Sequence, residues 1–259
     1  MGNSNTNTND IPHDIPKKWL IGSKQLDCSF NHLTSLPESI CHLNALQRLY
    51  CCHNQITSLP ESIKLLNNLQ TLWVIHNQLT SLPESISHLN DLQELDCDSN
   101  QLTNLPNSIF HLSGLQRLYC SNNQLTKLPE SIKHLINLRV LNVSYNQLTS
   151  LPESICHLNS LRLLDCSYNL LTSLPESIRY LNGLRDLRCY GNDIKYYYYR
   201  NSIREFRYNI ANEFKYYLQI KRTLNEQLIL DLDAVSIIMS FYNLDDYHPI
   251  ITSTTCVVC

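Results

Sequence analysis

The sequence predicts an α/β solenoid, in which short repeats stack side by side and share one continuous core. Three observations predict it: an asparagine recurs every 23 residues, apolar residues recur at fixed distances from it, and a Leu-Pro pair follows it in seven consecutive units. A unit this short cannot bury its apolar side alone, so each must pack on its neighbours. The asparagines are Asn31, Asn54, Asn77, Asn100, Asn123, Asn146, Asn169 and Asn192.

The first part of each unit predicts a β-strand. Residues 46–51 alternate apolar and polar side chains, which is the period of a half-buried strand. Strands of successive repeats then form a parallel sheet on the concave side, about 4.8 Å apart. The asparagine lies at the bend after the strand, where its side-chain amide can donate to a backbone C=O and accept from a backbone N–H. We therefore expect a ladder of stacked asparagines.

The second part of each unit predicts a short helix or turn on the convex side. Proline fixes φ as the chain enters this side, and the Glu-Ser pair that follows in six repeats suits a first helical turn. A basic residue lies three positions after the glutamate in three repeats, which predicts ion pairs on a solvated face. The pairs are Glu61 with Lys64, Glu130 with Lys133, and Glu176 with Arg179.

These motifs resemble the leucine-rich repeat family, in the intracellular 23-residue form with an LPxxI segment. Ras-suppressor-like proteins and the plant Ras-group-related proteins carry this form. The resemblance covers about residues 20 to 197 and rests on the Leu-Pro pairs at fixed spacing. It implies a horseshoe with its parallel sheet on the concave face. It also implies binding to proteins, with a small GTPase as one partner class by fold-level analogy.

The repeat pattern sets the expected domain limits. Residues 1–14 form a flexible polar N-terminal tail, residues 15–197 a solenoid of about seven to eight repeats, and residues 198–259 a helical C-terminal cap and tail. Apolar residues at helical spacing predict an amphipathic helix over 200–222 that covers the open end of the core. From Lys195 to Arg222 basic residues outnumber acidic ones, so this helix also suits an anionic membrane surface.

Composition limits the function classes. The 259 residues are 43% hydrophobic and 17% charged with a net charge of −3, which disfavours a general nucleic-acid binder and a disordered chain. No secretory signal or membrane-spanning stretch is recognisable, so we expect a cytoplasmic location. Abundant Asn, Ile and Tyr with only five Gly hint at an AT-rich genome, such as that of an amoeba or a large DNA virus.

The cysteines and histidines follow the repeat and predict no disulfide or metal site. Six cysteines share their repeat position with Val74 and Val143, as expected for small buried hydrophobes. Five histidines share another position, but no carboxylate or thiolate recurs beside them as a second ligand. The cysteines are Cys28, Cys51, Cys97, Cys120, Cys166 and Cys189, and the histidines are His42, His88, His111, His134 and His157.

No catalytic residue or cofactor is predicted. The chain has no glycine-rich phosphate loop, no H-E-x-x-H and no G-x-S-x-G. About 60 residues after the solenoid are few for an independent catalytic domain. We therefore expect a protein that is not an enzyme.

The outward strand positions, which vary between repeats, predict the functional site. An aromatic and basic group lies beside an acidic strand, and Trp, Tyr and Arg dominate binding energy at protein interfaces. The function indicated is a scaffold or adaptor, for example in intracellular signalling, that binds a partner on the concave face. Alternatively, the outward residues differ only because duplicated repeats change freely where packing does not constrain the residue type. The predicted contact residues are Arg48, Tyr50, Trp73, Ile75, Glu94, Asp96, Asp98, Arg117 and Tyr119.

The two ends of the chain offer an alternative function. The first six residues match the pattern for myristate on Gly2, and Cys256 satisfies C-a-a-X, although cysteine in the last position is atypical for prenylation. With the basic helix, an acyl chain would supply the two signals of a peripheral membrane protein. The alternative is thus a lipid-anchored protein at a membrane surface, and a second alternative is an adaptor for a ligase or another enzyme.

Overall fold

The computed structural model describes residues 15–16, 24–194, 251–252 and 255–256. The chain divides into two compact units, residues 1–202 and 203–259. The second unit contains a two-stranded antiparallel hairpin of β9 (Ile251–Thr252) and β10 (Thr255–Cys256). Four predicted features lie outside the described residues: the N-terminal tail, the myristate site at Gly2, the helix over 200–222 and most of the C-terminal cap.

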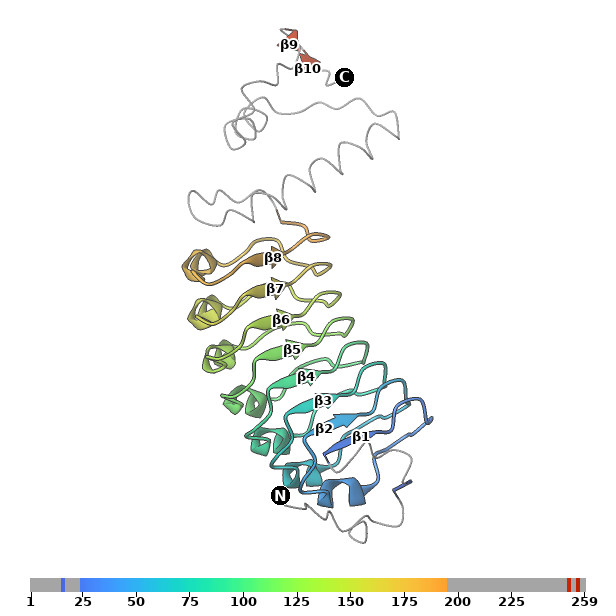
Figure 1. The fold of residues 1–259 in the computed structure, drawn as a ribbon. Helices are drawn as coiled ribbons and strands as arrows, with labels where there is room; N and C mark the ends of the chain where they lie inside the picture. Colours follow the sequence, from blue (N-terminus) through green and yellow to red (C-terminus); the bar gives the residue numbers. More distant parts are fainter. Residues whose placement is uncertain (1–14, 17–23, 195–250, 253–254, 257–259) are drawn as a thin grey trace. The chain divides into compact units, whose positions relative to one another are not determined.

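The first unit contains an open sheet of eight parallel strands in chain order (Figure 1). Each strand has three residues, fewer than the six that alternate in the sequence. Neighbouring strands pair at a constant offset of one repeat, as between Leu72 and Leu95. The strands are β1 (Gln25–Asp27), β2 (Arg48–Tyr50), β3 (Thr71–Trp73), β4 (Glu94–Asp96), β5 (Arg117–Tyr119), β6 (Val140–Asn142), β7 (Leu163–Asp165) and β8 (Asp186–Arg188).

A short 3₁₀ helix follows the Leu-Pro pair of each repeat, and these helices form a column of their own beside the sheet (Figure 1). Proline is the residue before each helix, with φ of −57 to −78°. The helices are η3 (Glu38–His42), η4 (Glu61–Leu65), η5 (Glu84–His88), η6 (Asn107–His111), η7 (Glu130–His134), η8 (Glu153–His157) and η9 (Glu176–Tyr180). None of the described helices is long and apolar enough to cross a bilayer.

The core runs between the sheet and the helices. In repeat 3 the inward residues Leu72, Val74 and Leu79 are fully buried, and Ile86 closes the core from the helix side. The cysteines at the Val74 position behave as the sequence predicted. Cys28, Cys51, Cys97, Cys120 and Cys166 are fully buried and carry free thiols, and Cys189 is half-buried.

The predicted asparagine ladder is confirmed. The amide nitrogen Nδ2 of Asn100 donates to the carbonyls of Val74 (2.9 Å), Cys97 (3.1 Å) and Asp98 (3.2 Å). Its Oδ1 accepts from the backbone N–H of Leu79 at 3.0 Å. One side chain thus bonds backbone groups of two consecutive repeats, and the same pattern recurs at the asparagines before and after it. The ladder ties each loop to its neighbour.

The predicted ion pairs within the short helices are wrong where the structure tests them. In the described part of the chain, Lys64 makes no ion pair with Glu61, and Lys133 makes none with Glu130. Glu130 instead accepts the N–H of Ser154 at 3.1 Å, and the Ser154 hydroxyl donates to the Glu130 carbonyl at 2.8 Å. The free N–H groups that open the next helix are the better partner for this carboxylate. The glutamate therefore links repeats.

Candidate interaction surface on the sheet face

The strand register brings most of the predicted contact residues into two adjacent rows on the outward face of the sheet. Tyr50, Trp73, Asp96 and Tyr119 are successive register partners on β2 to β5. Arg48, Glu94 and Arg117 lie in the parallel row, with Thr71 between the first two. With Ile75 and Asp98 from the loops after β3 and β4, the predicted contact residues make up one surface, here called the central patch.

A chain of direct contacts crosses the central patch. The rings of Tyr50 and Trp73 lie with centroids 4.7 Å apart. The indole Nε1–H of Trp73 donates to Oε1 of Glu94 at 3.0 Å, and Oε2 of Glu94 accepts from Nε of Arg117 at 2.7 Å. Four consecutive strands are linked in this way. The aromatic and acidic parts, which the sequence showed as neighbours, are therefore fixed to each other before any partner binds.

Two carboxyl groups of the patch, Asp96 and Asp98, form no ion pair with any cationic side chain in the part of the chain that the structure describes. Asp96 accepts the backbone N–H of Asp98 at 3.1 Å, and Asp98 accepts the backbone N–H of Ser121. Burial raises the pKa of Asp96 to about 6, with a contribution from Glu94. Burial, with the charge of Asp96, raises the pKa of Asp98 to about 7. Both groups therefore titrate near neutral pH.

The remaining predicted residues frame this centre. Arg48 is exposed at the start of β2, while Ile75 is half-buried after β3 and accepts the His53 N–H through its carbonyl at 2.9 Å. Tyr119 is half-buried, and burial raises the pKa of its hydroxyl, with Glu94 adding to the effect. The structure thus brings all nine predicted residues to one face.

The sequence interpretation missed two columns of rings at the position just before the ladder asparagine. Phe30, His53 and His76 stack with centroids 4.4 Å apart at each step. Tyr145 and Tyr168 stack at 4.3 Å, and Tyr190, which lies two residues before Asn192, meets Tyr168 edge-on at 5.4 Å. Apart from Tyr190, these residues have positive φ, between 51 and 58°. An aromatic residue recurring before the asparagine was the available signal, because residues 23 apart must lie side by side.

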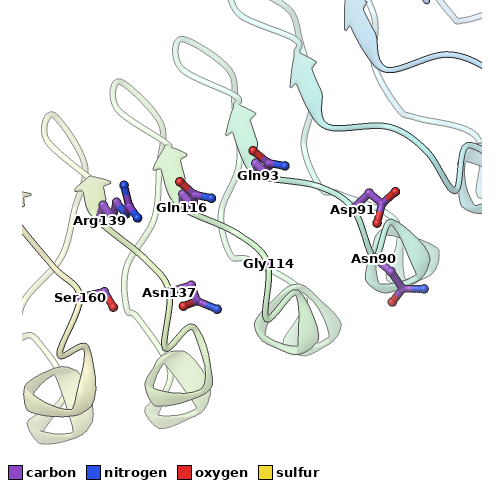
Figure 2. Close-up of a pocket in the computed structure, with 8 residues that line it drawn as sticks. All are labelled: Asn90, Asp91, Gln93, Gly114, Gln116, Asn137, Arg139 and Ser160. Atoms are coloured by element: carbon purple, nitrogen blue, oxygen red, sulfur yellow. The ribbon is translucent and has the colours of Figure 1, made fainter.

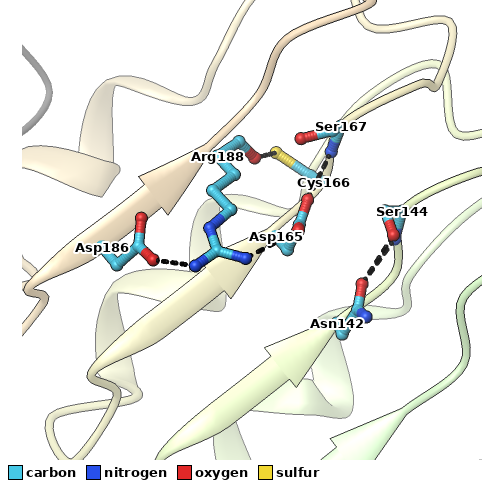
Figure 3. Close-up of polar contacts among 7 residues, drawn as sticks. All are labelled: Asn142, Ser144, Asp165, Cys166, Ser167, Asp186 and Arg188. Carbon is cyan, nitrogen blue, oxygen red and sulfur yellow. Dashed lines mark hydrogen bonds and ion pairs between the residues drawn. The ribbon is translucent and has the colours of Figure 1, made fainter. Parts of the chain in front are cut away.

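A second polar cluster lies in repeats 6 to 8 (Figure 3). Asp165 on β7 is 7% exposed, and Nη1 of Arg188 on β8 lies 3.7 Å from its carboxylate. Nη2 of Arg188 lies 2.6 Å from Asp186, and this contact raises the pKa of Arg188. Next to the cluster, the Ser144 hydroxyl donates to Asn142 at 2.8 Å. In this cluster the two carboxylates, Asp165 and Asp186, both form ion pairs with Arg188 of the same chain.

A polar groove of about 390 Å³ lies along the flank where β4 to β7 begin (Figure 2). Gln93, Gln116 and Arg139 stand in a row along it, since they occupy the same position of successive repeats. Gly114 also lines the groove, at the repeat position that Asp91, Asn137 and Ser160 occupy in the neighbouring repeats. The other lining residues are Asn90, Asp91, Asn137 and Ser160.

The described residues contain no group of three or more His, Cys, Asp or Glu side chains placed to hold a metal ion. The histidine column closes the 3₁₀ helices on the exposed side. His88 and His157 bond through Nδ1 to the carbonyls of Ser85 and Ser154, at 3.2 and 3.1 Å. These rings are used for local contacts within their own helices.

Models of one protein family match most of the solenoid. The model described as leucine rich repeat matches residues 92–148, 113–171 and 136–194, the two-copy leucine rich repeats model matches 44–82, and the single-repeat model matches 24–43. Together they cover more than half of the chain. The chain is a leucine-rich repeat protein. The LPxxI subtype and the origin inferred from composition remain predictions.

Solved structures of other leucine-rich repeat proteins share this fold. A leucine-rich repeat protein of Leptospira interrogans is 35% identical with a TM-score of 0.63, over 64% of this chain and 43% of that chain. The TLR13 chain of a TLR13–ssRNA13 complex is 28% identical with a TM-score of 0.56, over 64% and 24%. An internalin of Listeria monocytogenes is 25% identical with a TM-score of 0.56, over 62% and 46%.

The matched part of this leucine-rich repeat protein spans less than half the length of each of these three chains. No curated protein matches the sequence. The fold is typical of scaffolds that bind other proteins, and members of the family are generally not enzymes. The comparisons therefore support protein binding as the function class.

Proposed function

We propose that this leucine-rich repeat protein is a non-enzymatic scaffold or adaptor that binds a protein partner on the central patch. The observation that carries the proposal is the contact chain from Tyr50 through Trp73 and Glu94 to Arg117. Aromatic residues and arginine are enriched among the side chains that contribute most to protein interfaces. In this protein, aromatic residues and arginine lie together on the outward face of neighbouring strands, at positions where the residue type differs between repeats.

Rigidity supports the same proposal. Association is weakened by the cost of ordering side chains at the interface. In the central patch, Trp73 is held on one side by the Tyr50 ring and on the other by the Glu94 carboxylate. Arg117 is held by the same carboxylate. Tyr50, Trp73 and Arg117 are thus held by contacts within the chain, so a partner would need to order few of these side chains.

We also propose a signalling role, a partner class and a location for the protein. A role in intracellular signalling, a small GTPase as partner and a cytoplasmic location rest on family resemblance and composition. Lipid attachment at Gly2 lies outside the described residues, and for Cys256 the structure describes the backbone strand only. If the protein is instead an adaptor for a ligase or another enzyme, it would bind its partner through the same patch.

The proposal is tested by affinity capture from the cells in which the protein occurs. Wild type is compared with a patch variant that carries Trp73→Ala, Asp96→Lys and Asp98→Lys. The control variant carries Glu61→Lys and Glu84→Lys, which reverse two exposed charges on the helix side. Bound proteins are identified by mass spectrometry.

We expect that wild type and the control variant capture the same partners and that the patch variant loses them. They would also name the pathway. A list that is the same for all three proteins would show that the patch is not the binding site. An empty list would count against the adaptor and direct the search to the ends of the chain.

A further inference from the structure

Repeat 7 shows how this sheet face neutralises a carboxylate at the outward position where each strand ends. Asp165 ends β7, and the guanidinium of Arg188, its register partner on β8, lies 3.7 Å from the carboxylate (Figure 3). Asp165 is almost fully buried, so an unpaired charge there would be costly. The same guanidinium contacts Asp186 at 2.6 Å, so this cluster places one arginine beside two carboxylates.

Asp96 occupies the same repeat position three repeats earlier, but its surroundings differ. Its register partners are Trp73 on β3 and Tyr119 on β5, which carry no charge at neutral pH. Arg117 is engaged with Glu94 at 2.7 Å. Among the described residues, no Lys, Arg or His nitrogen forms an ion pair with Asp96 or Asp98. Asp96, which lies between these two rings, and Asp98, in the loop after β4, thus lack the ion pair that Asp165 has.

We propose that Asp96 and Asp98 bind an arginine side chain of the partner protein, between the rings of Trp73 and Tyr119. The proposal rests on the proposed function, since it names the chemistry of the partner at the same patch. A guanidinium suits the place because its planar donors match carboxylate oxygens in pairs and its face stacks on aromatic rings. Lysine, a compact and strongly hydrated charge, satisfies only part of this geometry.

The arginine is expected to bind with release of protons. Asp96 and Asp98 have pKa values raised to about 6 and 7, and a bound cation favours their ionised forms. The charged or titratable groups that face them are Glu94 on their own strand, Arg117 and Tyr119 on β5, Cys52 after β2, and Asp165 on β7. Arg117 is held by Glu94, so the partner's cation meets a net negative site. Affinity should therefore rise from pH 5 to pH 8.

A peptide selection tests the proposal without knowledge of the partner. A phage-displayed library of random twelve-residue peptides is selected at pH 8 on the full-length protein, and peptides that also bind the Trp73→Ala variant are discarded. The same selection is run on a variant with Asp96→Asn and Asp98→Asn. The control carries Glu61→Gln and Glu84→Gln, which remove two charges from the helix side. Circular dichroism checks that all variants fold.

The expected result is an arginine frequency in the wild-type peptides at least about twofold above that of the unselected library. The control should select the same peptides, and the Asn variant should lose the enrichment. For one synthetic peptide, fluorescence anisotropy should show binding at least about tenfold weaker to the Asn variant, as for loss of charge-assisted hydrogen bonds. Replacing its arginine by lysine, or lowering the pH to 5, should also weaken binding.

The other outcomes separate the two proposals. Peptides that depend on Trp73 but carry no excess of arginine would overturn the arginine assignment and leave the patch as a binding site. So would an arginine peptide that binds the Asn variant as tightly as wild type. A selection that yields no Trp73-dependent peptide would contradict both proposals.

Discussion

At the scale of single residues, the central patch holds two carboxyl groups whose surroundings disfavour ionisation. Asp96 and Asp98 are half-buried on one short strand and its loop, with Glu94 nearby and no ion-pair partner among the described side chains. Each accepts one backbone N–H, which offsets part of the cost of burial. The charged forms of the pair therefore cost stability, and such perturbed groups are common at functional sites.

This arrangement predicts that stability falls as pH rises. The folded-state pKa values of about 6 and 7 lie above the value of about 3.9 for an unfolded Asp, so the folded protein holds more protons between these limits. The stabilisation that comes from protonated Asp96 and Asp98 is therefore fully present below pH 4, and it is lost as pH rises to about 7. The variant with Asp96→Asn and Asp98→Asn should be more stable than wild type at pH 8. After allowance for solvent screening we expect about 1 kcal/mol, or about 3 °C in Tm.

The measurement is thermal unfolding followed by circular dichroism from pH 4 to pH 8. The advantage of the Asn variant should shrink toward pH 4. The variant with Glu61→Gln and Glu84→Gln is the control and should follow wild type. An advantage that is constant over this pH range would show that the effect is not electrostatic.

At the scale of elements, hydrogen bonds between repeats hold the short strands and helices in place. A three-residue strand and a five-residue 3₁₀ helix are too short to be stable alone. The sheet ladder, the asparagine ladder and the links from Glu130 to Ser154 and from Glu153 to Ser177 join each unit to the next. Each element is therefore stable because its counterpart one repeat away is already in place.

The asparagine ladder predicts a large effect for a small substitution. Asn100→Ala removes three donated hydrogen bonds and one accepted bond, and leaves buried backbone groups of Leu79 and Val74 without these partners. An unsatisfied buried polar group costs about 1–3 kcal/mol, so we expect a loss of about 3 kcal/mol in the free energy of unfolding. Urea denaturation at pH 7 measures it.

The matched control is Asn104→Ala in the same repeat. Asn104 is exposed, and the side-chain bond recorded for it is to the neighbouring Thr103 hydroxyl at 3.3 Å. Its substitution should change stability by no more than about 0.5 kcal/mol. Equal effects at the two positions would refute the structural role of the ladder.

At the scale of the whole molecule, stability is a sum over repeats and their interfaces. The constant register of the eight strands means that every interface in the solenoid has the same backbone geometry. The outward side chains of the sheet differ between repeats because they are not packed in the core. The same frame thus carries a patch with unpaired carboxylates at β4 and a cluster at β7 and β8 in which Arg188 pairs with Asp165 and Asp186.

Removal of one full repeat should leave a foldable protein. Deletion of residues 117–139 joins Gln116 to Val140 and preserves the 23-residue period. The shortened chain should unfold cooperatively, with a urea m-value about a tenth lower because less surface is exposed. Deletion of residues 117–127, about half a period, should abolish cooperative unfolding because it misplaces every later ladder position. Similar curves for the two deletions would contradict the repeat model.

The sequence by itself determined the repeat, the parallel sheet, the asparagine ladder and the burial of the cysteines. These features depend on residue type at a fixed period, and a period of 23 dictates which residues lie side by side. That the nine residues of the central patch share one face could be predicted for the same reason, while their role in binding a partner stays a prediction. The helix-side ion pairs could not, because local spacing does not show that Glu130 reaches the next repeat.

Only the tertiary structure decided how side chains on neighbouring strands contact each other. The bond from the Trp73 indole to Glu94, the pairing of Glu94 with Arg117, and the engagement of Arg188 with Asp165 depend on side-chain direction. The same holds for the ring columns at positive φ. A period fixes which backbones are neighbours. The packing of rings and charges above them decides which of the described carboxylates form an ion pair within the chain and which do not.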